Sequence, residues 1–323
     1  MHKRRVAILF GGKSAEHEVS IQSAYNIVEA MDSKKYEIIL IYIDHSGNWY
    51  LCENFDLKEN QVLDRDEISE YGQKLALMPG DNKDYLYNIE KNKIVDDIEV
   101  VFPVLHGPFG EDGTVQGLLK VIDIPFVGAG VLGSAVGMDK DIMKRLFRDG
   151  GLNIADYFVF RSIEEIDVDK IIRKLALPLF VKPANLGSSV GVKKVVKKAE
   201  IIGAIKNALK YDNKVIVEEF IDGRELECSV IGNNNPKASL AGEIMPKDDF
   251  YSYEAKYLDE NGAVLAIPAE ISEEELEKIQ FNAIKAFELL DCKGMARVDF
   301  FLSQERLYVN EINTIPGFTR ISM

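Results

Sequence analysis

The stretch Met295–Met323 reads MARVDFFLSQERLYVNEINTIPGFTRISM and is the most informative part of the chain. Apolar residues alternate over Ala296–Leu302, which predicts a strand, and a short polar turn follows it. A second strand is predicted over Leu307–Ile312, so the stretch reads as a β-hairpin.

Polar residues of this hairpin form a pattern typical of a metal site. Side chains on a strand alternate between its faces, so Arg297 shares a face with Asp299, and Glu311 shares a face with Asn313. If the two faces coincide, two carboxylates and an amide oxygen meet on a rigid sheet, as suits Mg²⁺. The nearby guanidinium suits a carboxylate or a developing oxyanion. The alternative is an exposed hairpin whose charges are merely solvated.

Composition restricts the class of protein. The chain has 323 residues, of which 46% are hydrophobic and 28% charged, so we expect two or three folded domains and no extended disorder. The net charge of −14 disfavours nucleic acid as a partner, because phosphates repel an acidic surface. ATP could still bind through a local cluster of lysines and a metal.

Cysteine spacing and hydropathy suggest where the protein works. Cys52, Cys228 and Cys292 are far apart and odd in number, which predicts reduced thiols and neither a zinc site nor a disulfide framework. The apolar run after MHKRR is too short for a signal sequence, and no run has the length of a membrane helix. We therefore expect a soluble cytoplasmic protein without a membrane partner.

The N-terminal region has the pattern of a doubly wound α/β domain. An apolar strand over Arg5–Phe10 leads into a glycine turn, a helix over Ile21–Met31 that Ser20 could cap, and a strand over Ile38–Ile43. The turn GGKSAE matches neither GxGxxG nor a P-loop. We expect a binding loop at the carboxyl end of the first strand, with Glu16 and Ser20 as polar candidates.

Glycine-rich loops follow two later strands. His106 begins the loop HGPFGEDG after a strand over Ile98–Leu105, where it could be structural or could bind a ligand. Lys182 lies on a strand over Pro178–Pro183, just before the loop Ala184–Gly191, ANLGSSVG. A strand-borne lysine beside a glycine-rich loop is suited to holding phosphates.

Further elements complete the prediction. Helices are predicted from Met138 to Phe147, over Ile163–Lys174 and over Ala199–Lys210, and another over Ser272–Leu290 begins with a Ser272–Glu275 capping box. Residues 242–246 and 248–258 are predicted to form a polar aromatic loop, which could be a lid or a packed surface loop.

Six motifs together resemble the D-alanine–D-alanine ligases of the ATP-grasp superfamily over nearly the whole chain. They are GGKSAEHEVS at 11–20, HGPFGEDGTVQG at 106–117, MDK at 138–140, VKPANLGSSVG at 181–191, YEAKY at 253–257 and the stretch 295–323. The resemblance implies an α/β ATP-grasp fold with an N-terminal doubly wound, Rossmann-like preATP-grasp domain. The implied domains are residues 1–128, a small central domain over 129–217 and a C-terminal domain over 218–323.

The resemblance also implies roles for particular residues. Those expected to bind ATP are Lys140, Lys182, Glu218, Phe220, Ile221, Glu225 and Lys256. Those expected to ligate two Mg²⁺ (or Mn²⁺) ions are Asp299, Glu311 and Asn313. Those expected at the two D-alanine sites or the reacting atoms are Glu16, His106, Ser188, Tyr257, Arg297, Gly317, Ser322 and Met323. The family also implies K⁺ activation and a homodimer formed through the first domain, neither of which is visible in the sequence.

The implied activity is ATP-dependent joining of two D-alanine molecules through D-alanyl phosphate, for peptidoglycan synthesis. A D-alanine–D-serine or D-alanine–D-lactate ligase, a different ATP-grasp ligase and a nucleotide-binding module without turnover are the alternatives. Two features depart from the family pattern. Arg320 replaces a small residue, and relatives continue past Met323, so we expect a C-terminal domain truncated at its end, with a weakened second-substrate wall.

Overall fold

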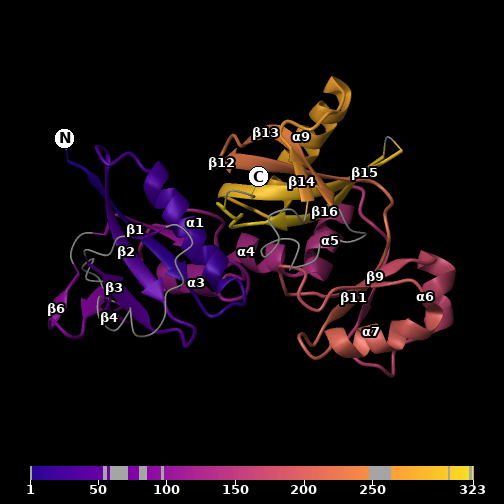
Figure 1. The fold of residues 1–323 in the computed structure, drawn as a ribbon, viewed down its shortest axis with the longest axis horizontal. Coiled ribbons are helices and arrows are strands. Elements are labelled where there is room, and N and C mark those ends of the chain that lie inside the picture. The colour runs from indigo at the N-terminus through magenta and orange to yellow at the C-terminus, as the bar shows by residue number, and fades with distance from the viewer. Residues whose placement is uncertain are drawn as a thin grey trace. The chain divides into compact units, whose positions relative to one another are not determined.

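The computed structural model describes residues 2–53, 57–58, 72–79, 86–95, 98–246, 263–304, 306–319 and 322. The chain divides into two compact units (Figure 1). Unit 1 comprises Met1–Ala135, Lys293–Met295 and Thr314–Met323, and unit 2 comprises Val136–Cys292 and Ala296–Asn313. Helices and mixed sheets in these units confirm the predicted α/β class. The three-domain division at 128 and 217 remains a prediction.

Unit 1 is built on a seven-stranded sheet in the order β6-β5-β4-β3-β2-β1-β7. Strand β1 lies between β2 and the edge strand β7 and pairs in parallel with both, whereas β2 to β6 pair antiparallel. The strands are β1 (Arg4–Gly11), β2 (Tyr36–Ile43), β3 (Trp49–Cys52), β4 (Gly72–Leu77), β5 (Leu86–Asn88), β6 (Lys93–Ile94) and β7 (Val100–Val104).

Strand β1 is buried on both faces, as its continuous apolar run predicts. Ala7 and Leu9 contribute to the core that includes Val115 and Leu119 of α3 (Thr114–Val121). Alternate residues, such as Ile8, face the second core, which includes apolar residues of α1 (His17–Ala30). Helices therefore cover both faces of the sheet, as a doubly wound domain requires. Helix α4 (Val131–Met138) follows.

The prediction that Ser20 caps helix α1 is wrong. The helix begins at His17 with Glu16 at the N-cap position, so Ser20 lies within its first turn. The Ser20 hydroxyl accepts a hydrogen bond from Gly11 N at 2.8 Å and donates to the carbonyl of Val104. It joins the ends of β1 and β7, because a buried serine satisfies backbone groups wherever they lack partners.

Unit 2 contains a four-stranded sheet in the order β10-β9-β11-β8 and a five-stranded sheet in the order β14-β13-β12-β15-β16. The strands are β8 (Tyr157–Phe160), β9 (Leu179–Pro183), β10 (Lys193–Val195), β11 (Val215–Glu219), β12 (Arg224–Gly232), β13 (Lys237–Pro246), β14 (Ala263–Ala266), β15 (Gly294–Ser303) and β16 (Arg306–Asn313). The helices are α5 (Lys140–Asp149), α6 (Val168–Leu175), α7 (Ile201–Ala208) and α9 (Glu273–Leu289), with a short 3₁₀ turn at Lys198–Glu200.

Several elements of unit 2 differ from their predictions. Helix α5 begins at Lys140 and not at Met138, because the side chain of Asp139 caps it there. Helix α6 begins at Val168 and not at Ile163, because the side chain of Asp167 accepts from Lys170 N and caps it there. Residues 242–246, predicted as loop, form the end of strand β13, and residues 247–262 lie outside the described part of the chain.

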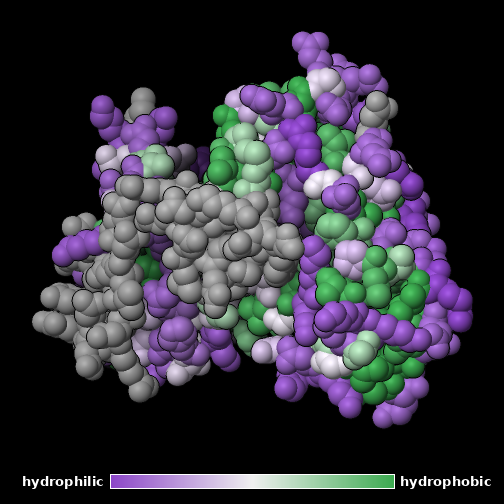
Figure 2. Space-filling view, turned by 45° about the vertical axis from the view of Figure 1, so that its right-hand side comes forward, coloured by the Kyte–Doolittle hydropathy of each residue, from purple (hydrophilic) through white to green (hydrophobic). Residues whose placement is uncertain are grey.

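Among the coloured residues on the face that Figure 2 shows, hydrophilic side chains surround several apolar patches. Across the described residues, no helix combines the length and apolar character that crossing a membrane requires.

Candidate functional site

The hairpin β15–β16 brings the four predicted polar residues onto one face. Arg297 pairs with Asn313 across the two strands, and Asp299 pairs with Glu311, with a bulge directly after Asp299. Residues directly opposite each other project to the same side of a sheet. The condition for the predicted metal site, that the two faces coincide, is therefore met.

Arg297 is held tightly by carboxylates. Its Nε lies 2.7 Å from Asp299 Oδ1 and 3.0 Å from Glu227 Oε2, and its second nitrogen donates to Asp299 Oδ2 at 2.9 Å. Burial acts to lower the pKa of Arg297, but the charges of Asp299 and Glu227 outweigh it and hold that pKa well above its usual value. Glu227 was absent from the prediction, although its alternation on β12 could have suggested an inward carboxylate.

The donor set fits a divalent cation. Asn313 Nδ2 donates to Asp299 Oδ2 at 3.0 Å, which fixes the amide beside the carboxylate. Glu311 adds a second carboxylate, and its Oε2 lies 3.4 Å from Lys140 Nζ. Carboxylate and amide oxygens are hard ligands of the kind that Mg²⁺ and Mn²⁺ accept. Lysine and arginine supply the countercharges in the structure.

A cavity of about 370 Å³ in unit 2 adjoins this face. It is bordered by the loop Ala184–Gly191, the end of β11 and the hairpin. The predicted site residues that line it are Lys140, Lys182, Ser188, Glu218, Phe220, Ile221, Glu225 and Glu311. Apolar walls with a few converging charged groups are typical of a small-molecule site.

Three charged residues meet at the wall of this cavity. Glu218 Oε2 lies 2.6 Å from Lys182 Nζ, and its other oxygen contacts Lys144 Nζ. Burial acts to raise the pKa of Glu218, but the two lysines outweigh burial and lower it, so this carboxylate is ionised. Burial acts to lower the pKa of Lys182, but the charge of Glu218 outweighs it and raises that pKa.

Lys144 was missed by the sequence analysis. It lies on α5, one helical turn after Lys140, and its side chain is 1% exposed. A lysine on an amphipathic helix is usually at the surface, and nothing in its immediate neighbourhood indicates burial.

Lys140 and the glycine-rich loop are in direct contact. Lys140 Nζ donates to the carbonyl of Leu186 at 2.8 Å, and Lys140 N donates to that of Ala184 at 3.0 Å. Within the loop, Ser188 and Ser189 adopt positive φ values of 49° and 58°, which residues with a side chain seldom adopt. Such backbone conformations occur often where a loop must meet a ligand.

In unit 1, the predicted substrate residues lie on neighbouring loops. Ser14 Oγ donates to the carbonyl of His106 at 2.6 Å and accepts from Glu16 N at 3.1 Å, so one hydroxyl joins the loops after β1 and β7. His106 is buried, with Nδ1 3.1 Å from the carbonyl of Ile315 and Nε2 2.9 Å from Ser23 Oγ.

Gly317 and Ser322 also lie together. A Cβ on Gly317 would approach Ser322 Oγ to 2.6 Å, so a larger residue at this position would require the Ser322 hydroxyl to move. The prediction did not include Glu111. Its carboxylate accepts hydrogen bonds from Ile315 N at 2.9 Å and from Gly107 N at 2.8 Å, and so connects the segment around Ile315 to the His106 loop. Tyr257, Lys256, Met323 and Arg320 lie outside the described residues.

Comparison with known proteins places this arrangement in a family. The family model of the D-ala D-ala ligase N-terminus matches residues 5–129, and that of the D-ala D-ala ligase C-terminus matches residues 146–323. The D-alanine–D-alanine ligase of Oceanobacillus iheyensis is 49% identical over 329 residues, which cover 99% of this chain and 89% of the relative. D-alanine–D-alanine ligase A of Escherichia coli K12 is 47% identical over 331 residues, which cover 100% of this chain and 90% of the relative.

Solved structures of similar fold point to the same family. The D-alanine–D-alanine ligase from Coxiella burnetii matches with a TM-score of 0.88 at 39% identity, covering 100% of this chain and 88% of that one. The VanG D-Ala:D-Ser ligase from Enterococcus faecalis matches with a TM-score of 0.87 at 35% identity, and the match covers 100% of this chain and 93% of that one. These similarities confirm the predicted ATP-grasp fold with its doubly wound N-terminal domain. With both halves matched by its models and relatives near 50% identity, the chain belongs to the D-alanine–D-alanine ligase family.

Proposed function

We propose that this protein joins two D-alanine molecules to D-Ala-D-Ala, converting ATP to ADP and phosphate, for peptidoglycan precursor synthesis. The observation that carries the proposal is the shared face of Arg297, Asp299, Glu311 and Asn313 beside a cavity that Lys140 and other predicted ATP-binding residues line. The family membership and the names of the relatives support it.

The reaction begins with activation of a carboxylate. A carboxylate is a poor electrophile because oxide is a prohibitive leaving group. Transfer of the γ-phosphoryl group of ATP to the first D-alanine gives D-alanyl phosphate, from which phosphate can leave. Such transfer needs positioning and charge neutralisation more than a covalent nucleophile. Lys140 and Lys182 are suited to this because both line the cavity.

Divalent cations would be held by Asp299, Glu311 and Asn313. Mg²⁺ or Mn²⁺, two ions by family resemblance, would neutralise the phosphate charges when bound. We assign the adenine to the wall formed by Glu218, Phe220 and Ile221, and the ribose to Glu225. Lys256 is a third candidate for the phosphates, and K⁺ is a candidate activator to be tested.

The amine of the second D-alanine then attacks the acyl phosphate. The tetrahedral oxyanion needs donors placed in advance, and we assign that role to Arg297 and the Gly317 amide. The carboxylates around Arg297 keep its guanidinium oriented without removing its charge. Phosphate then leaves and the peptide bond remains.

Substrate recognition is assigned by resemblance to residues of both units. Glu16, supported by Ser188 and Tyr257, would bind the ammonium of the first D-alanine, and His106 would lie near its carboxylate end. Ser322 and Met323 would line the second D-alanine site. Hydrogen bonds at both ring nitrogens of His106 fix its orientation, which suits a positioning role.

D-Serine is a second candidate for the accepting amino acid, because a D-Ala:D-Ser ligase is among the similar structures. Phosphate release from ATP and Mg²⁺ with D-alanine, D-serine and D-lactate, each tested with product mass, separates these activities. We expect release with D-alanine alone and a dipeptide of matching mass. Product containing serine or lactate would replace the proposal, and ATP binding without release would indicate a non-catalytic module.

Arg297→Met tests the role of the guanidinium. We expect kcat to fall about 100- to 1000-fold, the usual cost of losing an oxyanion donor. Arg173→Met, at an exposed position on α6, is the matched control and should retain full activity. An Arg297→Met enzyme that folds normally and keeps its kcat would exclude this assignment.

Three broader features belong to the same proposal. The three domains at 1–128, 129–217 and 218–323 are supported by three separate sheets. A cytoplasmic location follows from the chemistry, since ATP and peptidoglycan precursors occur there. A homodimer is proposed by resemblance, and light scattering that gives a mass twice that of one chain would support it.

A further inference from the structure

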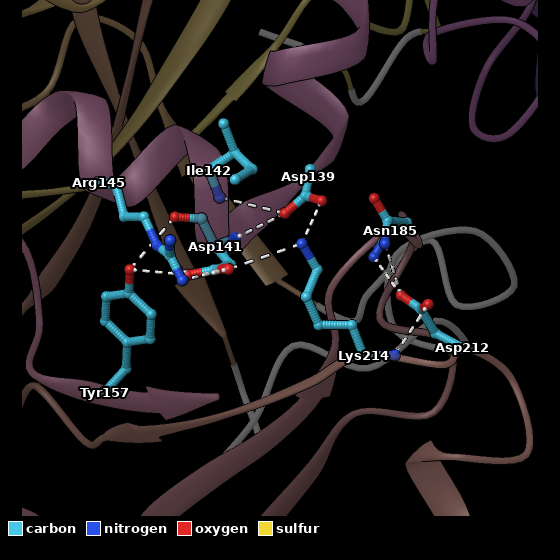
Figure 3. A network of polar contacts seen from close by, with 8 residues as sticks. All are labelled: Asp139, Asp141, Ile142, Arg145, Tyr157, Asn185, Asp212 and Lys214. Carbon is cyan, nitrogen blue, oxygen red and sulfur yellow. Dashed lines mark hydrogen bonds and ion pairs between the residues drawn. The ribbon is translucent and has the colours of Figure 1, made fainter. Parts of the chain in front are cut away.

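A group of polar side chains, partly buried and centred on the buried Lys214, connects helix α5 to the glycine-rich loop (Figure 3). Asp139 is the N-cap of α5, and its Oδ1 accepts from Asp141 N and Ile142 N, each at 3.1 Å. Its Oδ2 pairs with Lys214 Nζ. The residue that follows Asp139 is Lys140, so this contact fixes the start of the helix turn that carries a phosphate lysine.

Lys214 also holds the loop through its backbone. Its carbonyl accepts from Ala184 N at 2.9 Å, while the carbonyl of Ala184 accepts from Lys140 N at 3.0 Å. Ala184, the first residue of the loop, is therefore bonded on one side to Lys214 and on the other to Lys140. Lys214 is only 4% exposed, so the ion pair that anchors it is shielded from water.

Asp212 secures the next residue of the loop. Its Oδ2 accepts from Asn185 N at 2.7 Å and from Asn185 Nδ2 at 2.9 Å, and its Oδ1 accepts from Lys214 N at 3.2 Å. The residue after Asn185 is Leu186, whose carbonyl accepts a hydrogen bond from Lys140 Nζ. A continuous chain of bonds thus runs from Asp212 through the loop to the lysine ammonium.

Asp141 is the more distant of the two carboxylates that pair with Lys214. Arg145 binds the Asp141 carboxylate with both ends of its guanidinium, at 2.8 Å and 3.0 Å, and the Tyr157 hydroxyl lies 3.2 Å from it. Lys214 Nζ is 3.7 Å from Asp141 Oδ2, so its short contact is with Asp139. Figure 3 shows Arg145 and Tyr157 on the side of Asp141 away from Lys214.

We propose that Asp139, Lys214 and Asp212 are positioning residues that set the place of Lys140 and of the loop Ala184–Gly191 for the phosphates of a nucleoside triphosphate. None of the three is among the described residues that line the cavity, so they act through other groups. The inference rests on the proposed role of Lys140 and the loop in ATP binding.

Lys214→Met tests the inference, with Lys210→Met at an exposed position as the matched control. We expect the KM for ATP to rise between about tenfold and 100-fold, because misplacement of a positioned group by about 1 Å can cost up to about 100-fold. The KM for D-alanine should rise less than the KM for ATP, because Lys140 is assigned to ATP and only Ser188 of this loop is assigned to D-alanine. Lys214→Arg, which keeps a cation for Asp139, should restore most of the ATP affinity.

A double-mutant cycle with Lys140→Met separates positioning from general stability. If Lys214 acts through Lys140, its substitution should cost much less in KM for ATP once Lys140 is gone. Equal costs in both backgrounds, or a KM for ATP at the control value in Lys214→Met, would overturn the inference. If Lys214→Met does not fold, Asp212→Asn takes its place, and we expect it to raise the KM for ATP in the same way. A folded Asp212→Asn enzyme with an unchanged KM for ATP would equally overturn the inference.

The same cycle distinguishes the two proposals. A Lys140→Met enzyme with unchanged KM for ATP would contradict the proposed role of Lys140 and with it the positioning inference. A Lys140→Met enzyme with a raised KM, together with silent Lys214→Met and Asp212→Asn variants, would contradict the positioning inference alone.

Discussion

Lys144 is a buried lysine whose ion pair supports Glu218, a residue of the candidate site. With a side chain that is 1% exposed, it contacts one oxygen of Glu218, while Lys182 takes the other. If Lys182 turns toward a bound phosphate, Glu218 still has a cation beside it. A buried carboxylate without any cation would be costly, so Lys144 makes that exchange possible.

Lys144→Met should lower the free energy of unfolding by about 3 kcal/mol, as loss of one partner of a buried ion pair does. Urea denaturation of the ligand-free protein measures this. The double variant Lys144→Met/Glu218→Gln should recover part of the loss, because the neutral amide needs no cation. A single variant as stable as the parent would show that Lys182 alone suffices for Glu218.

Two buried thiols should be chemically inert in the folded protein. Burial raises the pKa of Cys52 to about 12 and that of Cys228 to about 11. Only the thiolate reacts with iodoacetamide, so at pH 8 labelling should be slow in native protein and rapid in urea, as mass spectrometry would report. Since both pKa values are raised, native labelling should speed up as the pH rises toward 11. Equal rates in both states would contradict this burial.

The residues that could be predicted are those whose types and spacing specify a chemistry. Arg297, Asp299, Glu311 and Asn313 are recognisable because strand alternation puts each pair on one face of its own strand, and the short turn brings the two strands together. Lys144 and Glu227 could not be found this way, since their partners come from other elements. Their burial is a property of tertiary packing, about which local sequence says little.

At the scale of elements, local sequence signals such as turns and caps predicted that a helix or strand is present better than they predicted where it begins and ends. The hairpin β15–β16 and the capping box of α9 are confirmed, because turn residues and caps act over three or four residues. Helix α6 starts five residues later than predicted, since Asp167 offers a better cap than the preceding polar residues. Residues 242–246 were mistaken for loop because pairing of β13 with β12 and β14 is a long-range property.

The capping box of α9 should make part of the stability depend on pH. The backbone N–H and the hydroxyl of Ser272 bond the Glu275 carboxylate and lower its pKa. A lowered pKa in the folded state stabilises the protein above the unfolded pKa of about 4.3 and loses this effect as the pH falls below it. Glu275→Gln should therefore destabilise at pH 7 but not at pH 3.

Glu277→Gln, at an exposed position on the same helix, is the control and should unfold like the parent at both pH values in urea. Ser272→Ala should cost about 1 kcal/mol at pH 7, the usual value of an N-cap. A Glu275→Gln difference that persists undiminished at pH 3 would mean that the carboxylate charge has no part in the cap.

At the scale of the whole molecule, the candidate metal ligands are integrated into a network of countercharges. Asp299 pairs with Arg297, and Glu311 lies beside Lys140. The acidic groups of the candidate metal site are thus compensated by the protein itself, although the chain carries a net charge of −14. We therefore expect the fold to form without a bound cation.

EDTA should abolish phosphate release while the urea midpoint of the ligand-free protein stays unchanged. A ligand stabilises the folded state only if it binds there, and the ion pairs already compensate these carboxylates. Restoring Mg²⁺ should restore activity without a refolding step. A midpoint that falls on EDTA treatment would instead identify a structural metal.

The division of the chain between the units has a consequence for its synthesis on the ribosome. Unit 1 includes Thr314–Met323, and Asn26 of α1 donates to the carbonyl of Phe318, 292 residues later. At about 5 to 20 residues per second, a ribosome needs roughly 15 to 60 s to make that interval. The hydrogen bond between His106 and the carbonyl of Ile315, and that from Phe318 N to Ser23 Oγ, likewise cannot form until the C-terminal residues have been made. The nascent N-terminal unit therefore emerges long before its last partners, and its closing contacts form late in translation.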